Sequence, residues 1–436
     1  MSKRKRLIVL YVIALCSQYL CAQTRTLGIE EIFRLADEQS TSIQTYKTGL
    51  EAASETLKAA KAQRLPDVNV SVSASYLGNG RLWDRDFSNT MKVDMPHWGN
   101  NFALQAQQVI YSGGAINSGI KQAELSNQLA ELDWQKNTQE VRFLLAGNYL
   151  NLYKLDNQIQ VLQKNLELTE QILENMVARR EQGTVLKNDI TRYELQKEQI
   201  KLQLVRVQNN RKIINHQLVT TLHLPENTEI LPDTSLLTQQ IVTLSENNWQ
   251  EIASNNNISL QQSQVAIQMN EQKVKQERSE FLPHIALIAA DHLDGPITIE
   301  VPVLNNNFNY WFVEIGVKYN LSSLFKNNRK LKQAHLNVRQ AEEQHQWAQE
   351  QIENAVQAGY TNFITAFYDL KTQENSVKLA DENYNVTSNR YQNDMALLTD
   401  MLDASNMKLS ADLELVNARI NVIYNYYQMK YITHTL

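Results

Sequence analysis

Two aspartates, Asp400 and Asp403, have the residue type and spacing that most suggest chemistry in this chain. They are three positions apart at the expected start of a helix, so both carboxylates fall on the same helix face. Such a pair could attract cations, and it could equally stabilise the positive N-terminal end of the helix dipole. The residues alone favour the second interpretation.

Patterns for catalysis or metal binding do not occur in the sequence. The eight histidines show no metal-ligand spacing such as His-Glu-x-x-His, and there is no Gly-x-Ser-x-Gly nucleophile motif. The glycines at 113–114 lack the Gly-Lys-Ser/Thr of a phosphate loop and indicate a turn between a strand and a helix. We therefore expect no enzymatic activity, no cofactor and no bound metal ion.

The first 22 residues have the features of a secretory signal peptide. Basic residues at 3–6 precede an apolar run, and Ala22 offers a small residue for cleavage. The apolar run of about ten residues is too short for a membrane-spanning helix, so an uncleaved anchor is the less favoured alternative. Cys16 and Cys21 both lie in this segment, so cleavage leaves a chain without cysteine. Neither cysteine follows a small residue, which disfavours a lipid anchor.

The charge of the mature chain is acidic. Loss of the leader removes four basic residues and no acidic one, so 38 basic residues remain against 47 acidic residues, a net charge of −9. This balance argues against a nucleic-acid partner. No later stretch approaches the roughly 18 apolar residues of a membrane helix, so any crossing of a membrane would have to use strands.

The chain repeats itself after about 211 residues. Four matched segments recur in the same order: 65–66 with 282–283, 121–123 with 332–334, 146–149 with 357–360, and 179–189 with 390–400. The segments indicate a first repeat at 23–223 and a second at 246–436. The connector at 224–245 contains Pro225 and Pro232 among mixed polar residues.

Each repeat contains two segments with the period-two pattern of a β-strand, at about 67–77 and 101–111, and at about 284–292 and 308–320. The first and last of them are apolar on one face and largely polar on the other. Ten-residue strands with tyrosine and tryptophan near their ends, joined by long loops, are typical of outer-membrane barrels. A soluble hairpin with one wet face is the alternative. Glu314 and Lys318 fall on the polar face, as a lumenal pair or, more simply, as solvated side chains.

The rest of the chain is expected to be mostly α-helical. Tyr193, Ile200, Val207 and Ile214 recur every seven residues, which is the pattern of helices packed in coiled-coil fashion. Helical hairpins with turns near 181–187 and 391–398 follow from this pattern. Four strands cannot close a membrane barrel, and open strand edges are not tolerated in lipid, so inserted strands would require an oligomer.

The order of these features across about 400 residues resembles the TolC family of outer-membrane efflux channels. The strand pairs after Leu-Pro, the two hairpin turns and the segment 397–404, which is similar to the family's Asp-Val-Leu-Asp-Ala sequence, carry the resemblance. It implies a homotrimer in which four strands per protomer form a shared 12-stranded barrel in outer-membrane lipid. The helices would form a periplasmic tunnel, an exit duct for an inner-membrane pump and a periplasmic adaptor.

The resemblance also assigns roles at the hairpin tips. Asp400 and Asp403 would line a periplasmic constriction, where copies on one axis repel one another, which raises some of their pKa values, and attract cations. Tyr391 matches a tyrosine that helps to latch the closed tip, although Ala396 stands where some members have a basic residue. The turns would dock partner proteins through these residues: Gly183, Asp189, Arg390 and Asp394.

Two other classes of protein remain as alternatives. A periplasmic adaptor also has long coiled-coil hairpins, but it places one hairpin in a lipoyl-like domain and has no membrane-type strand pairs. A secreted structural coiled-coil protein would leave the alternating apolar and polar residues of the expected strands unexplained. Such a protein would be soluble without detergent, which would distinguish it from a membrane channel. The sequence does not name the cargo or the class of pump.

Overall fold

The computed structural model describes residues 24–233, 241, 243–300, 302–393 and 395–436. The expected signal peptide at 1–22, part of the connector and Asp394 lie outside the described residues. Of the described helices, none combines the length and the apolar composition that a membrane span requires.

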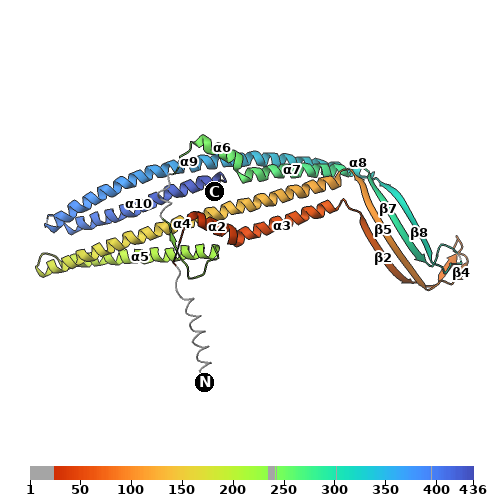
Figure 1. The fold of residues 1–436 in the computed structure, drawn as a ribbon, viewed down its shortest axis with the longest axis horizontal. Helices are drawn as coiled ribbons and strands as arrows, with labels where there is room; N and C mark the ends of the chain where they lie inside the picture. The colour runs from red at the N-terminus through yellow and green to blue at the C-terminus, as the bar shows by residue number, and fades with distance from the viewer. Residues whose placement is uncertain (1–23, 234–240, 242, 301, 394) are drawn as a thin grey trace, which may run out of the picture. The chain divides into compact units, whose positions relative to one another are not determined.

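The described chain is mostly α-helical and consists of two similar halves, which confirms the predicted fold class (Figure 1). The first half contains β1 (Thr24–Leu27), α2 (Ile29–Gln39), α3 (Thr41–Ala62), β2 (Asp67–Tyr76), β3 (Gly80–Trp83), β4 (Thr90–Val93), β5 (Trp98–Ser112), α4 (Ala115–Glu181) and α5 (Lys187–Thr221). The second contains β6 (Glu229–Pro232), α6 (Glu246–Asn256), α7 (Ile258–Ser279), β7 (His284–Gly295), β8 (Phe308–Lys318), α8 (Ser323–Lys326), α9 (Asn328–Gln392) and α10 (Leu398–Ile432).

By compactness the chain divides differently, into two units that each draw on both halves. The hairpin unit contains the described residues up to Thr48 together with Leu132–Gln261 and Trp347–Leu436. The strand unit contains Gly49–Glu131 and Gln262–Gln346. The helices α3, α4, α7 and α9 contribute residues to both units. Each unit is described by itself below.

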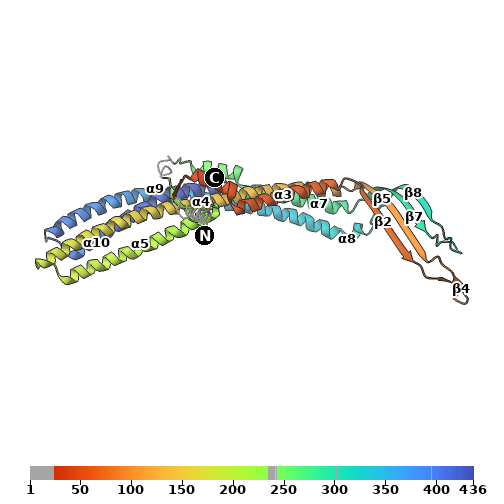
Figure 2. The ribbon, with the colours of Figure 1, turned by 60° about the horizontal axis from the view of Figure 1, so that its bottom comes forward.

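The strand unit is built around one four-stranded antiparallel sheet with the order β2-β5-β7-β8 (Figure 2). Residues that pair across strands point to the same side of a sheet. Val68 pairs with Ala106, Ala106 with Ala289, and Ala289 with Val313, so this row forms part of one apolar face. Within the described chain, β2 and β8 are the edges of this sheet.

Gly113 positions the start of α4 beside the end of α7 in the strand unit. Its φ of +61° lies in the left-handed region, which favours glycine. A Cβ atom at this position would lie 2.8 Å from the carbonyl oxygen of Ser279. The glycines at 113–114 therefore do act as a turn between a strand and a helix, because only glycine tolerates both the backbone angle and the close approach.

The hairpin unit contains two hairpins, α4 with α5 and α9 with α10. Both α5 and α10 have 35 residues, and α10 begins at Leu398, 211 positions after α5 begins at Lys187. The two turns also match, because the amide of Thr184 donates to the carbonyl of Arg179 at 3.1 Å, and the amide of Met395 donates to that of Arg390 at 2.7 Å. The repeat seen in the sequence is thus a repeat of backbone geometry.

In this unit the C-terminal ends of α5 and α10 form side-chain hydrogen bonds with residues that are distant in the sequence. His223 and His434 follow α5 and α10, both with positive φ angles, of 50° and 53°. The imidazole Nε2 of His223 lies 2.9 Å from the hydroxyl of Thr41, at the start of α3. Asn257, before α7, donates to the carbonyl of Ile432 at 2.9 Å. The end of each hairpin's second helix is therefore hydrogen-bonded to the start of the 22-residue helix of its own repeat, α3 or α7.

The largest core of the hairpin unit surrounds the middle of α4. Leu145, Tyr149 and Leu152 are fully or almost fully buried, and residues of α2, α5, α10, β1 and β6 pack against them. Full burial of each leucine contributes about 1.5–3 kcal/mol. The Tyr149 hydroxyl donates to the carbonyl of Leu27 at 3.0 Å and accepts from the amide of Asp233 at 2.8 Å. Burial raises the pKa of Tyr149 to about 12.

Candidate functional site

The tips of the two hairpins pack against each other through a small apolar core. Its buried members come from all four helices and the first turn: Met176, Val185, Ile190, Tyr193, Tyr384, Leu398 and Met401. The hydroxyl of Tyr193 is buried and has no hydrogen-bond partner among the described residues. Burial raises the pKa of this phenol well above its usual value, so it stays protonated. The unpaired hydroxyl makes this core less stable than an apolar one of the same shape.

Tyr391 is held inside the protomer by Arg179 of the other hairpin. The Arg179 guanidinium lies 5.4 Å from the centre of the Tyr391 ring, and its Nη1 donates to the Tyr391 carbonyl at 3.4 Å. A cation–π contact of this kind contributes about 0.5–1 kcal/mol at an exposed site. The sequence pointed to Tyr391 but not to Arg179, whose position in the repeat matches that of Arg390.

Asp400 caps the start of α10. Its Oδ2 accepts a hydrogen bond from the amide of Leu397 at 3.0 Å, which satisfies a donor at the helix N-terminus. Asp403 is exposed and has no ion-pair or hydrogen-bond partner within the described protomer. Both carboxylates therefore lie at the surface of the tip, one fixed by its helix and the other open to solvent.

The residues expected to dock partners lie at the two turns. Gly183 has a φ of +80° with open space around it, and the amide of Asp189 donates to the carbonyl of Leu186 at 3.1 Å. Arg390 is exposed and donates to the carbonyl of Met395 at 3.2 Å. Asp394 lies outside the described residues.

Exposed apolar side chains surround these turns and were missed by the sequence reasoning. Leu186 is 71% exposed, and Leu397, 211 positions later in the second repeat, is 70% exposed. Met395 is also 70% exposed. The signal that could have found the leucines is their recurrence just after the helix break in both repeats. One exposed leucine beside each turn can contact another protein more readily than the turn glycine alone.

Glu314 and Lys318 lie on the polar face of the sheet, in rows with Ile288 and His284. No salt bridge joins the two side chains in the described part of the chain. The same face has an aromatic row that the sequence reasoning passed over. The ring of Tyr310 stacks 5.3 Å from that of Phe308 and 5.1 Å from that of His292. Its signal is the period-two spacing of the aromatic residues at 308, 310 and 312.

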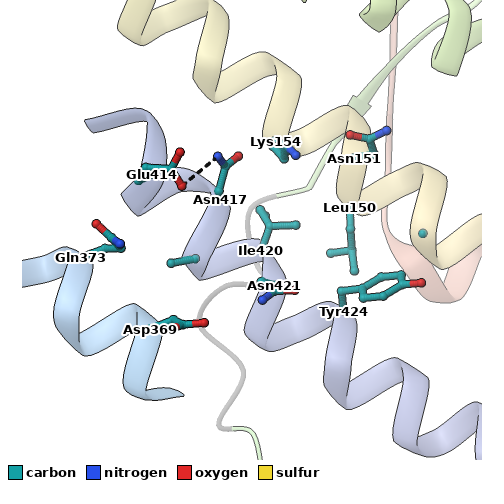
Figure 3. A pocket seen from close by; sticks show the side chains of 12 residues that line it. Leu150, Asn151, Lys154, Asp369, Gln373, Glu414, Asn417, Ile420, Asn421 and Tyr424 are labelled. Carbon is teal, nitrogen blue, oxygen red and sulfur yellow. Dashed lines mark hydrogen bonds between the residues drawn. The ribbon is translucent and has the colours of Figure 1, made fainter. Parts of the chain in front are cut away.

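A polar groove of about 750 Å³ lies between the hairpins, lined by α4, α9 and α10 (Figure 3). Asn151 and Lys154 extend from α4, Asp369 from α9, and Asn417 and Asn421 from α10. In the described residues no group of three or more histidine, cysteine, aspartate or glutamate side chains could hold a metal ion. The groove is thus a largely amide-lined surface between helices.

Comparison with known proteins identifies the class of this fold. The family model of outer membrane efflux proteins matches residues 32–222 and 249–429, so the chain belongs to that family. It is 21% identical to the outer membrane protein TolC of Salmonella enteritidis over 449 residues, which cover 100% of this chain and 87% of that protein. The resemblance to the TolC family drawn from the sequence is confirmed, and the chain is an outer-membrane transport protein of that family.

Solved structures of outer-membrane channels have the same fold. The outer membrane protein VceC of Vibrio cholerae superposes with a TM-score of 0.78 at 14% identity, over 93% of this chain and 96% of that one. The open state of the MtrE channel of Neisseria gonorrhoeae gives a TM-score of 0.74 at 15% identity, over 93% and 88% of the two chains. Family and fold are therefore those of channel proteins rather than enzymes.

Proposed function

We propose that this chain is the outer-membrane exit channel of a tripartite efflux or type I secretion system. Three copies would close their sheets into one 12-stranded barrel. The observation that carries the proposal is the four-stranded sheet with two free edges and an exposed apolar face. Val70 is 72% exposed, Trp311 is 74% exposed, and both lie on that face.

The energetics of the sheet favour closure with other copies. Unpaired backbone groups at β2 and β8 would each cost several kcal/mol in hydrocarbon, and pairing β8 of one copy with β2 of the next removes that cost. The apolar row of Val68, Ala106, Ala289 and Val313 would then face lipid. Glu314 and Lys318 would face the lumen, where a charged pair is solvated.

In this account the hairpins form a periplasmic tunnel that is gated at the tips. Symmetric copies would bring Asp400 and Asp403 of each chain around one axis, where their charges attract cations. The Arg179–Tyr391 contact would hold the closed tip within each protomer, in the role expected for Tyr391. The cap that Asp400 provides for α10 is compatible with this role, because the carboxylate remains exposed.

A periplasmic adaptor and an inner-membrane pump would be the partners. The turns at Gly183, Asp189, Arg390 and Asp394 would form the docking surface, with Leu186 and Leu397 supplying exposed apolar contacts. The channel would act as a passive conduit without chemistry of its own. The secretory leader expected at 1–22 supports export, and a lipid on Cys16 or Cys21 would be the alternative form of anchoring.

Single-channel conductance in a planar bilayer tests the gate. The double variant Asp400→Ala with Asp403→Ala should open to a larger conductance and lose cation selectivity, because both gate carboxylates are gone. Asp189→Ala is the matched control, since Asp189 occupies the position of Asp400 in the first repeat. Equal conductance and selectivity in the wild type and the double variant would contradict the gate.

A periplasmic adaptor or a structural coiled-coil protein is the alternative function. Either would be soluble without detergent and would give no conductance, whereas the proposed channel requires detergent because of its apolar strand face. Fractionation of the mature protein with and without detergent distinguishes a membrane channel from a soluble coiled-coil protein before any variant is made.

A further inference from the structure

One carboxylate interrupts the apolar face of the four-stranded sheet. Asp291 of β7 pairs with Leu104 of β5 on one side and with Trp311 of β8 on the other, so its side chain points to the same face as theirs. Asp291 is exposed, and it forms no ion pair with any described residue of the protomer. An isolated charge on a strand surface that faces lipid is unfavourable, so this carboxylate requires a partner from outside the protein.

Asn309 holds the Asp291 side chain in place without neutralising it. The amide Nδ2 of Asn309 donates to Oδ1 of Asp291 at 2.9 Å and to the backbone carbonyl of His292 at 3.0 Å. An ionised carboxylate can accept about four hydrogen bonds, and the amide is a neutral donor. The negative charge of Asp291 is therefore positioned but uncompensated.

A cavity of about 460 Å³ lies beside this carboxylate on the sheet. Its lining combines the Asp291–Asn309 pair with apolar side chains: Leu104, Ala106, Ala289, Trp311 and Val313. Ala106 and Ala289 pair with each other one row away from the row of Asp291. Because both are small, they leave open the space that larger side chains would fill. The cavity thus has an apolar floor and one acidic edge.

Two aromatic residues indicate where the cavity would lie in a membrane. Trp311 is 74% exposed on the apolar face, and Tyr319, eight positions later, directly follows β8. Tryptophan and tyrosine concentrate at the two boundaries of a membrane. Eight residues extend about 27 Å along a strand, which a tilt of about 40° reduces to about 20 Å, comparable with the ~25 Å apolar band of such barrels. Asp291, opposite Trp311, therefore lies at the level of lipid headgroups.

We infer that this cavity binds a membrane lipid whose headgroup carries a protonated amine. The ammonium lies at Asp291, and an acyl chain covers Ala106 and Ala289. An ammonium supplies both the positive charge and the N–H donors that Asp291 lacks, and the alanine floor gains from contact with an aliphatic chain. The inference rests on the membrane insertion of the proposed function and adds a lipid site to it. Copies that pair edge to edge leave this face open to lipid.

A divalent cation that bridges to a lipid phosphate is the competing partner for such a carboxylate. Calcium takes six to eight oxygen ligands, commonly from several carboxylates. Among the described residues that line the cavity, Asp291 is the one acid. In the same part of the chain, no group of three or more histidine, cysteine, aspartate or glutamate side chains could hold a metal ion. The lining therefore favours an ammonium over a metal ion.

Native mass spectrometry of the mature protein in detergent tests the site. The protein is incubated with equal amounts of phosphatidylethanolamine and phosphatidylglycerol that carry the same acyl chains. The wild type should retain phosphatidylethanolamine with a preference of about tenfold, because a charge-assisted hydrogen bond replaces repulsion. Equal retention of both lipids would overturn the inference. Retention of phosphatidylglycerol that depends on Mg²⁺ and is lost with a chelator would overturn it as well.

Variants locate the preference at this cavity. Asp291→Asn should reduce the preference to near unity, because the side chain keeps its shape but loses its charge. Ala289→Leu fills the floor and should reduce retention of both lipids. Asp294→Asn is the matched control, because Asp294 lies on the same strand but on the opposite face, where it accepts a hydrogen bond from Asn101. Equal losses in Asp291→Asn and Asp294→Asn would contradict a site at Asp291.

The outcomes separate the lipid site from the proposed channel. A particle of three chains whose lipid preference disappears in Asp291→Asn supports both. A particle of three chains that conducts ions but has no lipid preference overturns the lipid site and leaves the channel standing. A water-soluble monomer without conductance overturns both. The mass of each variant in the same spectra shows whether it still assembles.

Discussion

The turn of the first hairpin and the turn of the second share one backbone hydrogen bond but differ in sequence. Thr184 and Met395 donate to the matching carbonyls of Arg179 and Arg390, whereas the sequence changes from Gly183 to Asp394 between them. Backbone geometry is therefore preserved where the helices must pack, and the side chains have diverged where the tips face solvent.

The two hairpins also differ in charge at the start of their second helices, α5 and α10. The second hairpin has Asp400 and Asp403, while the corresponding positions of the first are Asp189 and Arg192. Two carboxylates on one face give the second hairpin a negative end that the first lacks. The difference assigns any charged constriction to the second hairpin, and it makes the first hairpin a natural control for each variant.

The largest expected effect comes from the two buried cores of the hairpin unit that surround α4 and α9. Phe363 of α9 and its counterpart Leu152 of α4 are both fully buried. Replacement by alanine should lower the free energy of unfolding by about 3–5 kcal/mol for Phe363 and about 2–5 kcal/mol for Leu152. Urea unfolding of the detergent-solubilised protein measures both. Leu144→Ala, at a side chain that is 56% exposed, is the control, and equal midpoints for all three variants would contradict the burial of Phe363 and Leu152.

A smaller effect is expected on the pH dependence of stability, and it differs between the two hairpins. Burial raises the pKa of Asp412 on α10, partly offset by Lys408, and Asp381 adds repulsion. Because the folded state binds this proton more readily than the unfolded state, stability falls as pH rises from the usual Asp pKa through the raised value. Asp412→Asn should therefore raise the unfolding midpoint at neutral pH, with a difference from wild type that vanishes near about pH 3.

The first hairpin provides the comparison for this titration. Its corresponding position is Lys201, which pairs with Glu198 at 3.0 Å. Lys201→Gln should leave the pH profile of the midpoint unchanged over the same range. If the difference in unfolding midpoint between Asp412→Asn and the wild type were the same at every pH, burial of the Asp412 carboxylate would not lower the stability of the folded state.

The smallest effect is expected at the latch between the tips. Arg179→Ala removes the cation over Tyr391 and should weaken the closed tip by about 0.5–1 kcal/mol. The resting channel should then open more often in a bilayer recording, while single-opening conductance stays the same. Arg390→Ala, at the matching position of the second hairpin, should leave the opening frequency closer to wild type. A greater effect at Arg390 would place the latch between chains instead.

Much of the fold could be predicted because its signals are local. Alternation at Val68, Val70 and Val72 indicates a strand with one apolar face, and the seven-residue spacing from Tyr193 indicates coiled-coil packing. These patterns and the repeat were enough for the fold class. The short strands β1 and β6 pair in parallel across the chain, and their four residues each are too few to show a period.

The candidate site was less predictable because its contacts are distant in sequence. Tyr391 could be proposed from the resemblance, but its contact with Arg179 joins residues on different hairpins. The cap that Asp400 provides for α10 follows from the residues alone, as the dipole interpretation expected. Whether the same carboxylate lines a constriction depends on other copies of the chain, which no pattern within one sequence encodes.

The mass of the mature protein extracted in detergent, combined with its conductance in a planar bilayer, tests the central claim most directly. The account predicts a particle of three chains that forms small, cation-selective openings. A water-soluble monomer without conductance would contradict it and would return the chain to the class of periplasmic coiled-coil proteins.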